Sequence, residues 1–126
     1  MSDPTYALHV ALLERMSALV DVDVWDAVPN GAEYPYVTLD TIEASNEDMT
    51  NNRMERRFAY FNIWSRHPGQ AEVLQIMGQM DAINGERLAL QTGHVAHLEV
   101  SRKRTSREAD NLTFQGRLTL EIITKH

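Results

Sequence analysis

The sequence predicts an α+β fold with a largely antiparallel (mixed) sheet and two helices, in the order α-β-β-β-α-β-β-β. Apolar residues recur at helical spacing in two segments, residues 3–20 and 67–85. The other apolar segments alternate with polar residues, as half-buried strands do, and turn-rich connections join them in place of helical crossovers. Because the chain has 126 residues, of which 43% are hydrophobic, we expect a single domain over residues 1–126 with one core.

Both helices are predicted from start and stop signals as well as from periodicity. Asp3 is suited to be the N-cap of the first helix, with Pro4 as its first helical residue. Pro68 lies near the first turn of the second helix, and Gly85 ends that helix. The apolar stripes are Leu8, Leu12, Met16 and Leu19 in the first helix, and Val73, Ile76, Met77, Met80 and Ile83 in the second.

Three strands are predicted between the helices. A short strand over 21–28 is followed by one over 34–42, and the strongest strand covers 56–65. The last of these has Phe58, Tyr60 and Trp64 on one face and Ala59, Phe61 and Ile63 on the other. A strand that is apolar on both faces is typical of a sheet centre that is covered on both sides. We expect one cover to be a helix, and the other to be the second helix or a neighbouring subunit.

The second helix is followed by three more predicted strands. A short strand over 87–91 leads through a turn at Gly93 to a longer one over 94–104, and the chain ends in a strand over 111–126. The last strand is predicted to turn Leu112, Phe114, Leu118, Leu120 and Ile122 inward and Thr113, Gln115, Arg117, Thr119 and Glu121 outward.

Catalytic and metal-binding patterns are not evident. Cysteine is absent, which excludes disulfides and thiolate metal ligands and fits a reducing compartment. His94 and His97 lie three apart in a strand, so they point to opposite faces and cannot share an ion. Phosphate-binding loops and the nucleophile elbow have no counterpart, and Asp21, Asp23 and Asp26 are interpreted as a solvated strand end. We therefore expect no enzymatic activity, no metal and no cofactor.

Charge and hydropathy point to a soluble protein with electrostatically uneven surfaces. The N-terminus has no basic segment before an apolar run, and no window approaches the length of a membrane span, so neither a signal peptide nor membrane association is expected. Residues 1–50 hold ten acidic and one basic residue, and residues 51–126 hold eight acidic and eleven basic residues, so the halves carry −9 and +3 of the net charge of −6. This asymmetry indicates either complementary surfaces or a generally acidic exterior.

Two polar segments are the candidate functional sites. The first, residues 43–57, joins two strong strands where a two-residue turn would suffice, and its mixed charge with little apolar content is typical of a segment that orders on a partner. We interpret it as an assembly loop. Its charged residues are Glu43, Glu47, Asp48, Arg53, Glu55, Arg56 and Arg57.

The second segment is the basic run SRKRTSREAD, at the expected turn between the last two strands. Its cations are Arg102, Lys103, Arg104 and Arg107. Such a cluster suits an acidic partner or passing DNA, but no aromatic residue is interleaved with it to stack on bases. A solvated hairpin tip and a docking or channel-lining hairpin are both open interpretations.

Two motifs resemble the tail terminator (tail completion) family of long-tailed bacteriophages and related gene transfer agents. The first is the stretch VWDAVPNGAEYPYV, and the second is a strand ending in WSR before a helix. The matching residues are Val24, Trp25, Asp26, Ala27, Val28, Pro29, Gly31, Ala32, Pro35, Tyr36 and Val37, then Trp64, Ser65 and Arg66, with Gly69 and Glu72 where the helix begins. The strand-and-turn order of the last part is also similar, so the resemblance covers nearly the whole chain.

This resemblance implies a structural virion protein. Members of the family form a six-membered ring on the end of a finished tail tube, stop its polymerisation and present the surface that joins the head. The implied partners are further copies of the chain, the major tail tube protein, a head completion or connector protein, and DNA that passes without sequence-specific binding. The implied location is the head-proximal end of the tail, after assembly in the host cytoplasm. The alternatives are another connector or neck protein and, from other classes, a small nucleic-acid-binding protein or a hydrolase.

Overall fold

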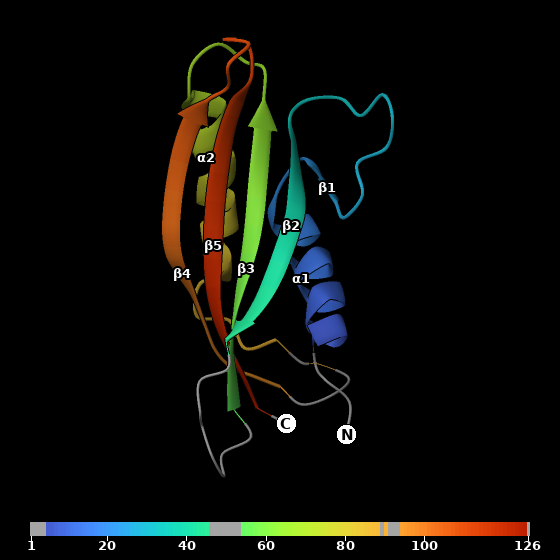
Figure 1. The fold of residues 1–126 in the computed structure, drawn as a ribbon, viewed down its shortest axis with the longest axis vertical. Coiled ribbons are helices and arrows are strands. Elements are labelled where there is room, and N and C mark those ends of the chain that lie inside the picture. The colour runs from blue at the N-terminus through green and yellow to red at the C-terminus, as the bar shows by residue number, and fades with distance from the viewer. Residues whose placement is uncertain (1–4, 46–53, 89, 91–93, 126) are drawn as a thin grey trace.

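A computed structural model describes residues 5–45, 54–88, 90 and 94–125, and these form two α-helices and a five-stranded sheet (Figure 1). In chain order the elements are α1 (Thr5–Leu19), β1 (Asp23–Trp25), β2 (Tyr36–Ser45), β3 (Met54–Ser65), α2 (Ala71–Met80), the short 3₁₀ helix η1 (Asp81–Ile83), β4 (His94–Arg107) and β5 (Phe114–Lys125). The predicted α+β class is confirmed. The proposed cap at Asp3 and Pro4 and the turn at Gly93 lie outside the described residues.

The strand order across the sheet is β1-β2-β3-β5-β4. Only β1 and β2 are parallel, and every other neighbouring pair is antiparallel, which makes the sheet mixed. The last strand, β5, is inserted between β3 and β4, so it lies beside a strand about 60 residues earlier in the chain. This insertion makes β3 and β5 the centre of the sheet and β4 one of its edges.

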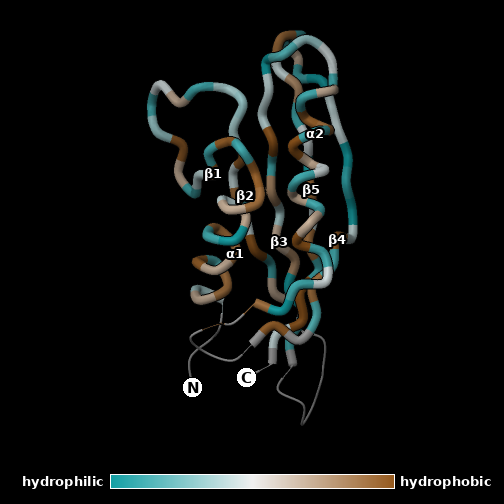
Figure 2. Tube along the Cα trace, turned by 180° about the vertical axis from the view of Figure 1, so that it is seen from behind, coloured by the Kyte–Doolittle hydropathy of each residue, from teal (hydrophilic) through white to brown (hydrophobic). Residues whose placement is uncertain are grey.

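Both helices cover the same face of the sheet (Figures 1 and 2). The expected apolar stripe of α1 faces the sheet, since Leu8, Leu12 and Met16 are fully buried. The sheet contributes side chains that alternate along β3 and β5, as the two-residue period of a strand requires. The buried core includes Val73, Ile76, Met77 and Met80 from α2, Ala59, Phe61 and Ile63 from β3, and Leu118, Leu120 and Ile122 from β5.

A glycine in β5 lets α2 approach the sheet closely. A Cβ at Gly116 would lie 2.5 Å from Val73 Cγ1, closer than real Cβ atoms come, and 3.0 Å from Met77 Cε, which is a tight contact. Since α2 presents its buried stripe at this point, any side chain at position 116 must displace a packed neighbour. The close contact ties the second helix to the centre of the sheet.

The face with Phe58, Tyr60 and Trp64 has no helix over it in the described part of the chain. The expectation that the second helix would cover this face is therefore wrong: α1 and α2 pack side by side on the opposite one. Phe58, Tyr60 and Trp64 are only partly buried. A neighbouring subunit, the other predicted cover, stays a prediction.

Several strand boundaries differ from the prediction. Residues 86–88 and 90 are not in a strand, although Leu88 accepts a backbone hydrogen bond from Val95 and so lies along β4. In the other direction, β4 runs on to Arg107, which moves the turn to residues 108–113. Leu112, predicted to face inward, is 65% exposed, because it belongs to this turn and precedes β5. None of the described helices is long and apolar enough to cross a bilayer.

Candidate functional site: the open face of the sheet

Alternation along the four longer strands places one polar and aromatic set of side chains on the face away from the helices. Register connects the strands in rows: Asn62 pairs with Arg117, and Arg117 pairs with Arg104. In the next row Tyr60 pairs with Thr119, and Thr119 with Arg102. The open face therefore carries guanidinium groups of β4 and β5 beside aromatic rings of β3.

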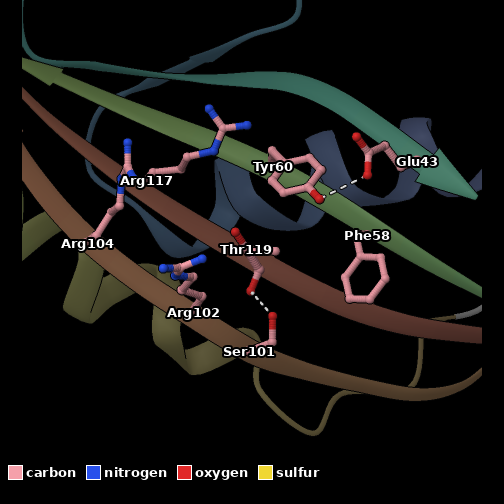
Figure 3. Close-up of a pocket in the computed structure, with 8 residues that line it drawn as sticks. All are labelled: Glu43, Phe58, Tyr60, Ser101, Arg102, Arg104, Arg117 and Thr119. Atoms are coloured by element: carbon pink, nitrogen blue, oxygen red, sulfur yellow. Dashed lines mark hydrogen bonds between the residues drawn. The ribbon is translucent and has the colours of Figure 1, made fainter.

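These side chains line a groove of about 560 Å³ (Figure 3). The lining residues are Glu43, Phe58, Tyr60, Ser101, Arg102, Arg104, Arg117 and Thr119. The three arginines gather on one side of the groove and the single carboxylate, Glu43, lies on the other (Figure 3). The groove is thus electrostatically polar along its length, with cations toward the edge strand β4.

Arg117 is held in place by its neighbours in the described structure. Its guanidinium carbon lies 4.7 Å from the centroid of the Tyr60 ring, which suits a cation–π contact. Its Nη1 atom is 3.6 Å from Asp40 Oδ2 and donates a 3.5 Å hydrogen bond to Asn62 Oδ1. These contacts make Arg117 a fixed positive group on the floor of the groove.

Tyr60 links the aromatic row to the acidic side of the groove. Its hydroxyl donates a 3.0 Å hydrogen bond to Glu43 Oε2. Burial raises the pKa of Tyr60, and the hydrogen bond and the charge of Glu43 raise it further, against a smaller opposing effect of Arg117. The phenol therefore stays protonated and acts as a hydrogen-bond donor at any physiological pH.

The predicted basic run lies in the edge strand β4, so the expectation that it forms the hairpin turn is wrong. Its four cations divide between the two faces. Lys103 is 3.5 Å from Asp81 Oδ2 of η1, and the Arg107 guanidinium lies 5.2 Å from the ring centroid of Phe114. Arg102 and Arg104 point to the open face, where neither has an ion-pair partner within the described residues. Strand alternation divides the run, and Arg117, which sequence reasoning did not connect with it, joins the open-face pair through register alone.

The predicted assembly loop is also shorter than expected. Glu43 lies in β2, and Glu55, Arg56 and Arg57 lie in β3, so only residues 46–53 separate the strands. Glu47, Asp48 and Arg53 lie outside the described residues. The two strands of this hairpin are longer than their hydrophobic pattern indicates, because cross-strand pairing continues into charged residues.

Arg57 is the clearest departure from an exposed loop residue, since its side chain is fully buried on the helix face. Its Nε donates a 3.0 Å hydrogen bond to Thr5 Oγ1 of α1, and its Nη2 lies 2.9 Å from Glu55 Oε2. A further hydrogen bond joins Nη1 to Thr124 Oγ1 of β5. Arg57 thereby connects the start of α1 to β3 and β5, so its side chain contributes to the packing of the fold.

The chemistry available on the open face is binding. Guanidinium groups recognise carboxylates and phosphates, and aromatic rings add contact area. Within the described residues, no group of three or more histidine, aspartate or glutamate side chains is arranged to hold a metal ion. Hydrogen bonds from the backbone of Thr113 and Leu112 lower the pKa of Asp110, which belongs to the β4–β5 turn.

Comparisons with known proteins agree with this architecture. A family model described as Tail completion protein gp17 matches residues 7–125. Among solved structures, a chain of the structure described as "Virion of native gene transfer agent (GTA) particle" has a similar fold, with a TM-score of 0.87 and 20% sequence identity over 100% of both chains. At this level of identity, the likeness concerns the fold. No curated protein matches the sequence.

Proposed function

Because the chain belongs to the Tail completion protein gp17 family, we propose that it is a non-enzymatic virion protein that caps the end of a phage or gene transfer agent tail tube as a ring. The ring stops polymerisation of the tube and presents the surface to which the head is joined. The resemblance seen in the sequence motifs is confirmed at the level of the family. The ring, its position and its partners are the content of the proposal.

The observation that carries the proposal is the open face of the sheet. Aromatic rings beside arginines on an open sheet face are typical of a surface that contacts a partner, because both residue types are enriched at protein interfaces. In an assembly subunit the same face is available to a neighbouring copy or to the contents of a channel. A ring also needs two different surfaces that fit each other, and the division of acidic and basic residues along the groove supplies such a pair.

The proposed partners follow from this role. Copies of the chain, six in number by the family resemblance, contact one another around the ring. The major tail tube protein lies on one side and a head completion or connector protein on the other. DNA passes through the centre without sequence-specific binding, and the protein assembles in the host cytoplasm before it resides in the head-proximal tail.

Two parts of the chain have more specific proposed roles. The segment between β2 and β3, residues 46–53 with Glu47, Asp48 and Arg53, contacts a neighbouring subunit or the tail tube as an assembly loop. On the open face, Arg102 and Arg104 act with Arg117 to meet the phosphates of passing DNA or the carboxylates of a partner. Because these contacts are with charged backbone or side-chain groups, they need no base recognition.

Deletion of the gene from the phage or transfer agent that carries it tests the function. Negative-stain microscopy is expected to show tails of irregular, extended length that are not joined to heads. Tails of normal length that fail to join heads would identify a neck protein instead. Normal particles would refute the proposal altogether.

Complementation with charge variants tests the open face. The double variant Arg102→Glu/Arg104→Glu is expected to lower the yield of DNA-transferring particles. Lys103→Glu/Arg107→Glu is the matched control, because it reverses two charges on the same strand, and both side chains lie on the helix side of the sheet. An equal effect of both variants would count against a role for the open face.

A further inference from the structure

Both edges of the sheet have a stretch that no described strand pairs with. At one edge, β1 pairs only with Tyr36–Thr38 of β2, so the outer side of residues 39–45 faces no strand of the described chain. A trough of about 580 Å³ runs along this stretch. It is lined by Thr5, Tyr6, His9, Asp26, Leu39, Asp40, Thr41 and Ile42. The trough lies where a longer β1 would continue.

At the other edge, the segment after η1 occupies only the first half of β4. The backbone N–H of Gly85 donates to the Leu98 carbonyl, Val95 N–H donates to Leu88, and Val100 N–H donates to Asn84 Oδ1. Beyond Val100, residues 101–107 have no neighbouring described strand on the outer side. Both available stretches are thus seven residues long, by the count from 39 to 45 and from 101 to 107.

We propose that the free edge of β2 in one copy pairs with the free edge of β4 in the next copy, so that the sheets of neighbouring subunits join edge to edge. The proposal rests on the proposed function, which requires copies to assemble as a ring. The strand directions suit it: three successive antiparallel pairings from β2 to β4 make these two strands run in opposite directions. Copies related by rotation about an axis along the strands therefore pair in the antiparallel sense.

The charges on the two edges are complementary. Asp40 and Glu43 lie on the β2 stretch, whereas the β4 stretch carries four cations. A joint must also keep the helix-covered faces on the same side, since a one-residue slip would invert every side chain. Counting alternation from the observed registers, such a joint pairs Glu43 with Arg102 and Thr41 with Arg104. A slip by two residues places Glu43 opposite Arg104, which is also an attractive pair.

The offset between the two free stretches sets the strand tilt that a closed ring would have. Residues 39–45 lie level with β3 residues 61–56, and residues 102–107 lie, through β5, level with β3 residues 60–65. Pairing Glu43 with Arg102 shifts adjacent copies by about two residues, or about 7 Å, over a five-strand sheet about 24 Å wide. Pairing Glu43 with Arg104 shifts them by about four residues, or about 13 Å. The resulting strand tilt is about 15° for the first register and about 30° for the second, which lies nearer the 35–45° typical of closed sheets.

Disulfide cross-linking tests the joint directly, because the chain contains no cysteine. Within one copy, positions 41 and 104 are three strand spacings apart, about 14 Å, which is too far for a disulfide. Oxidation of Thr41→Cys/Arg104→Cys is expected to give a ladder of covalent multimers that ends at the ring. Thr41→Cys/Ser106→Cys gives the ladder instead if the joint is slipped by two residues. Thr41→Cys/Leu112→Cys is the control, with a second cysteine at an exposed position away from the edge.

Two results would overturn the proposal. One is that both test variants give no cross-linked species larger than a dimer, although sedimentation shows that the protein is assembled. The single variant Thr41→Cys, which can form only dimers, shows what this result looks like. The other is a strict monomer with and without added tail tubes. Tail capping is scored separately by microscopy. Capped tails without the ladder would contradict the joint alone, and a cross-linked ring that leaves tails uncapped would contradict the proposed function alone.

A charge exchange provides an independent readout. Glu43→Arg and Arg102→Glu are each expected to raise the dissociation constant between copies about tenfold, because they oppose like charges at the joint. The combined variant is expected to recover most of the affinity. The slipped register is tested in the same way with Glu43→Arg/Arg104→Glu. If neither double variant assembles better than its single variants, the two edges do not meet.

Discussion

Replacing Gly116 by alanine is expected to destabilise the protein, although alanine normally stabilises a strand relative to glycine. Its backbone does not have the positive φ that would exclude a side chain, so the cost comes from packing. The added methyl group would lie 2.5 Å from Val73 Cγ1 and 3.2 Å from Ile63 Cδ1. Val73 is fully buried on α2, and its β-branched side chain has one preferred rotamer in a helix, so it cannot turn away.

The magnitude follows from two opposing contributions. Overfilling a packed core typically costs about 1–3 kcal/mol. The lower flexibility of alanine in the unfolded chain returns about 0.4–1 kcal/mol. We expect a net loss of about 1–2 kcal/mol, which lowers the melting temperature by about 4–8 °C in a chain of this length.

The assay is urea and thermal unfolding followed by circular dichroism, with Gly116→Ala measured in the wild type and in a Val73→Ala background. Removing the two Val73 methyl groups opens the space that the new methyl needs, so the second measurement is expected to show no loss. Gly78→Ala is the matched control. Gly78 is exposed in α2 with nothing within 4 Å of its Cβ position, and alanine there is expected to stabilise by about 0.5–1 kcal/mol.

The reasoning is refuted if Gly116→Ala costs the same in both backgrounds. The loss would then not arise from the contact with Val73, and the close approach of α2 to β5 would not explain the glycine. A denaturant slope that changes along with the midpoint would also disqualify the comparison, because the unfolded state would differ.

Three further predictions concern charged groups. Arg57→Leu is expected to lower the free energy of unfolding by about 1–3 kcal/mol, because the hydroxyl groups of Thr5 and Thr124 lose their hydrogen-bond donor. Loss of tail capping at an unchanged free energy of unfolding would instead favour an assembly role for Arg57. The lowered pKa of Asp110 contributes stability above the pKa of the unfolded carboxyl and loses it as the pH falls through the folded pKa. Asp110→Asn should therefore flatten the acid limb of a stability–pH curve, and an unchanged limb would contradict this. Glu86→Gln removes the charged partner of Arg15, whose pKa is raised by Glu86. Because salt screens charge interactions, the change in melting temperature that this substitution causes is expected to be smaller in 1 M salt.

Much of the fold was predictable because it depends on local periodicity. The helical spacing of Leu8, Leu12 and Met16 identified the buried side of α1, and all three are fully buried. The alternation in 56–65 likewise separated the two faces of β3. Local turn chemistry was harder to predict. Leu112 was assigned to a strand, but Asp110 accepts hydrogen bonds from the N–H groups of residues 112 and 113 and holds them in the turn.

The candidate site was predictable only in part. The basic run and the polar segment over residues 43–57 both stand out in the sequence, and both are predicted to lie in connections between strands. In the structure, pairing with β5 extends β4 through the basic run, and pairing of β2 with β3 extends both strands into the polar segment. Backbone hydrogen bonds to a neighbouring strand can hold charged residues in a strand, and a single sequence does not show which strand is the neighbour.

The amino-acid pattern alone was enough for the helices, the main strands, the absence of cysteine chemistry and the membership of the tail completion family. The pattern could not show that β5 inserts between β3 and β4, or that both helices lie on one face. Those two features bring Arg117 beside Arg102 and Arg104 and leave the aromatic side of β3 open. Side-chain alternation is a property of each strand by itself, whereas strand order depends on pairing between residues that are far apart in the chain.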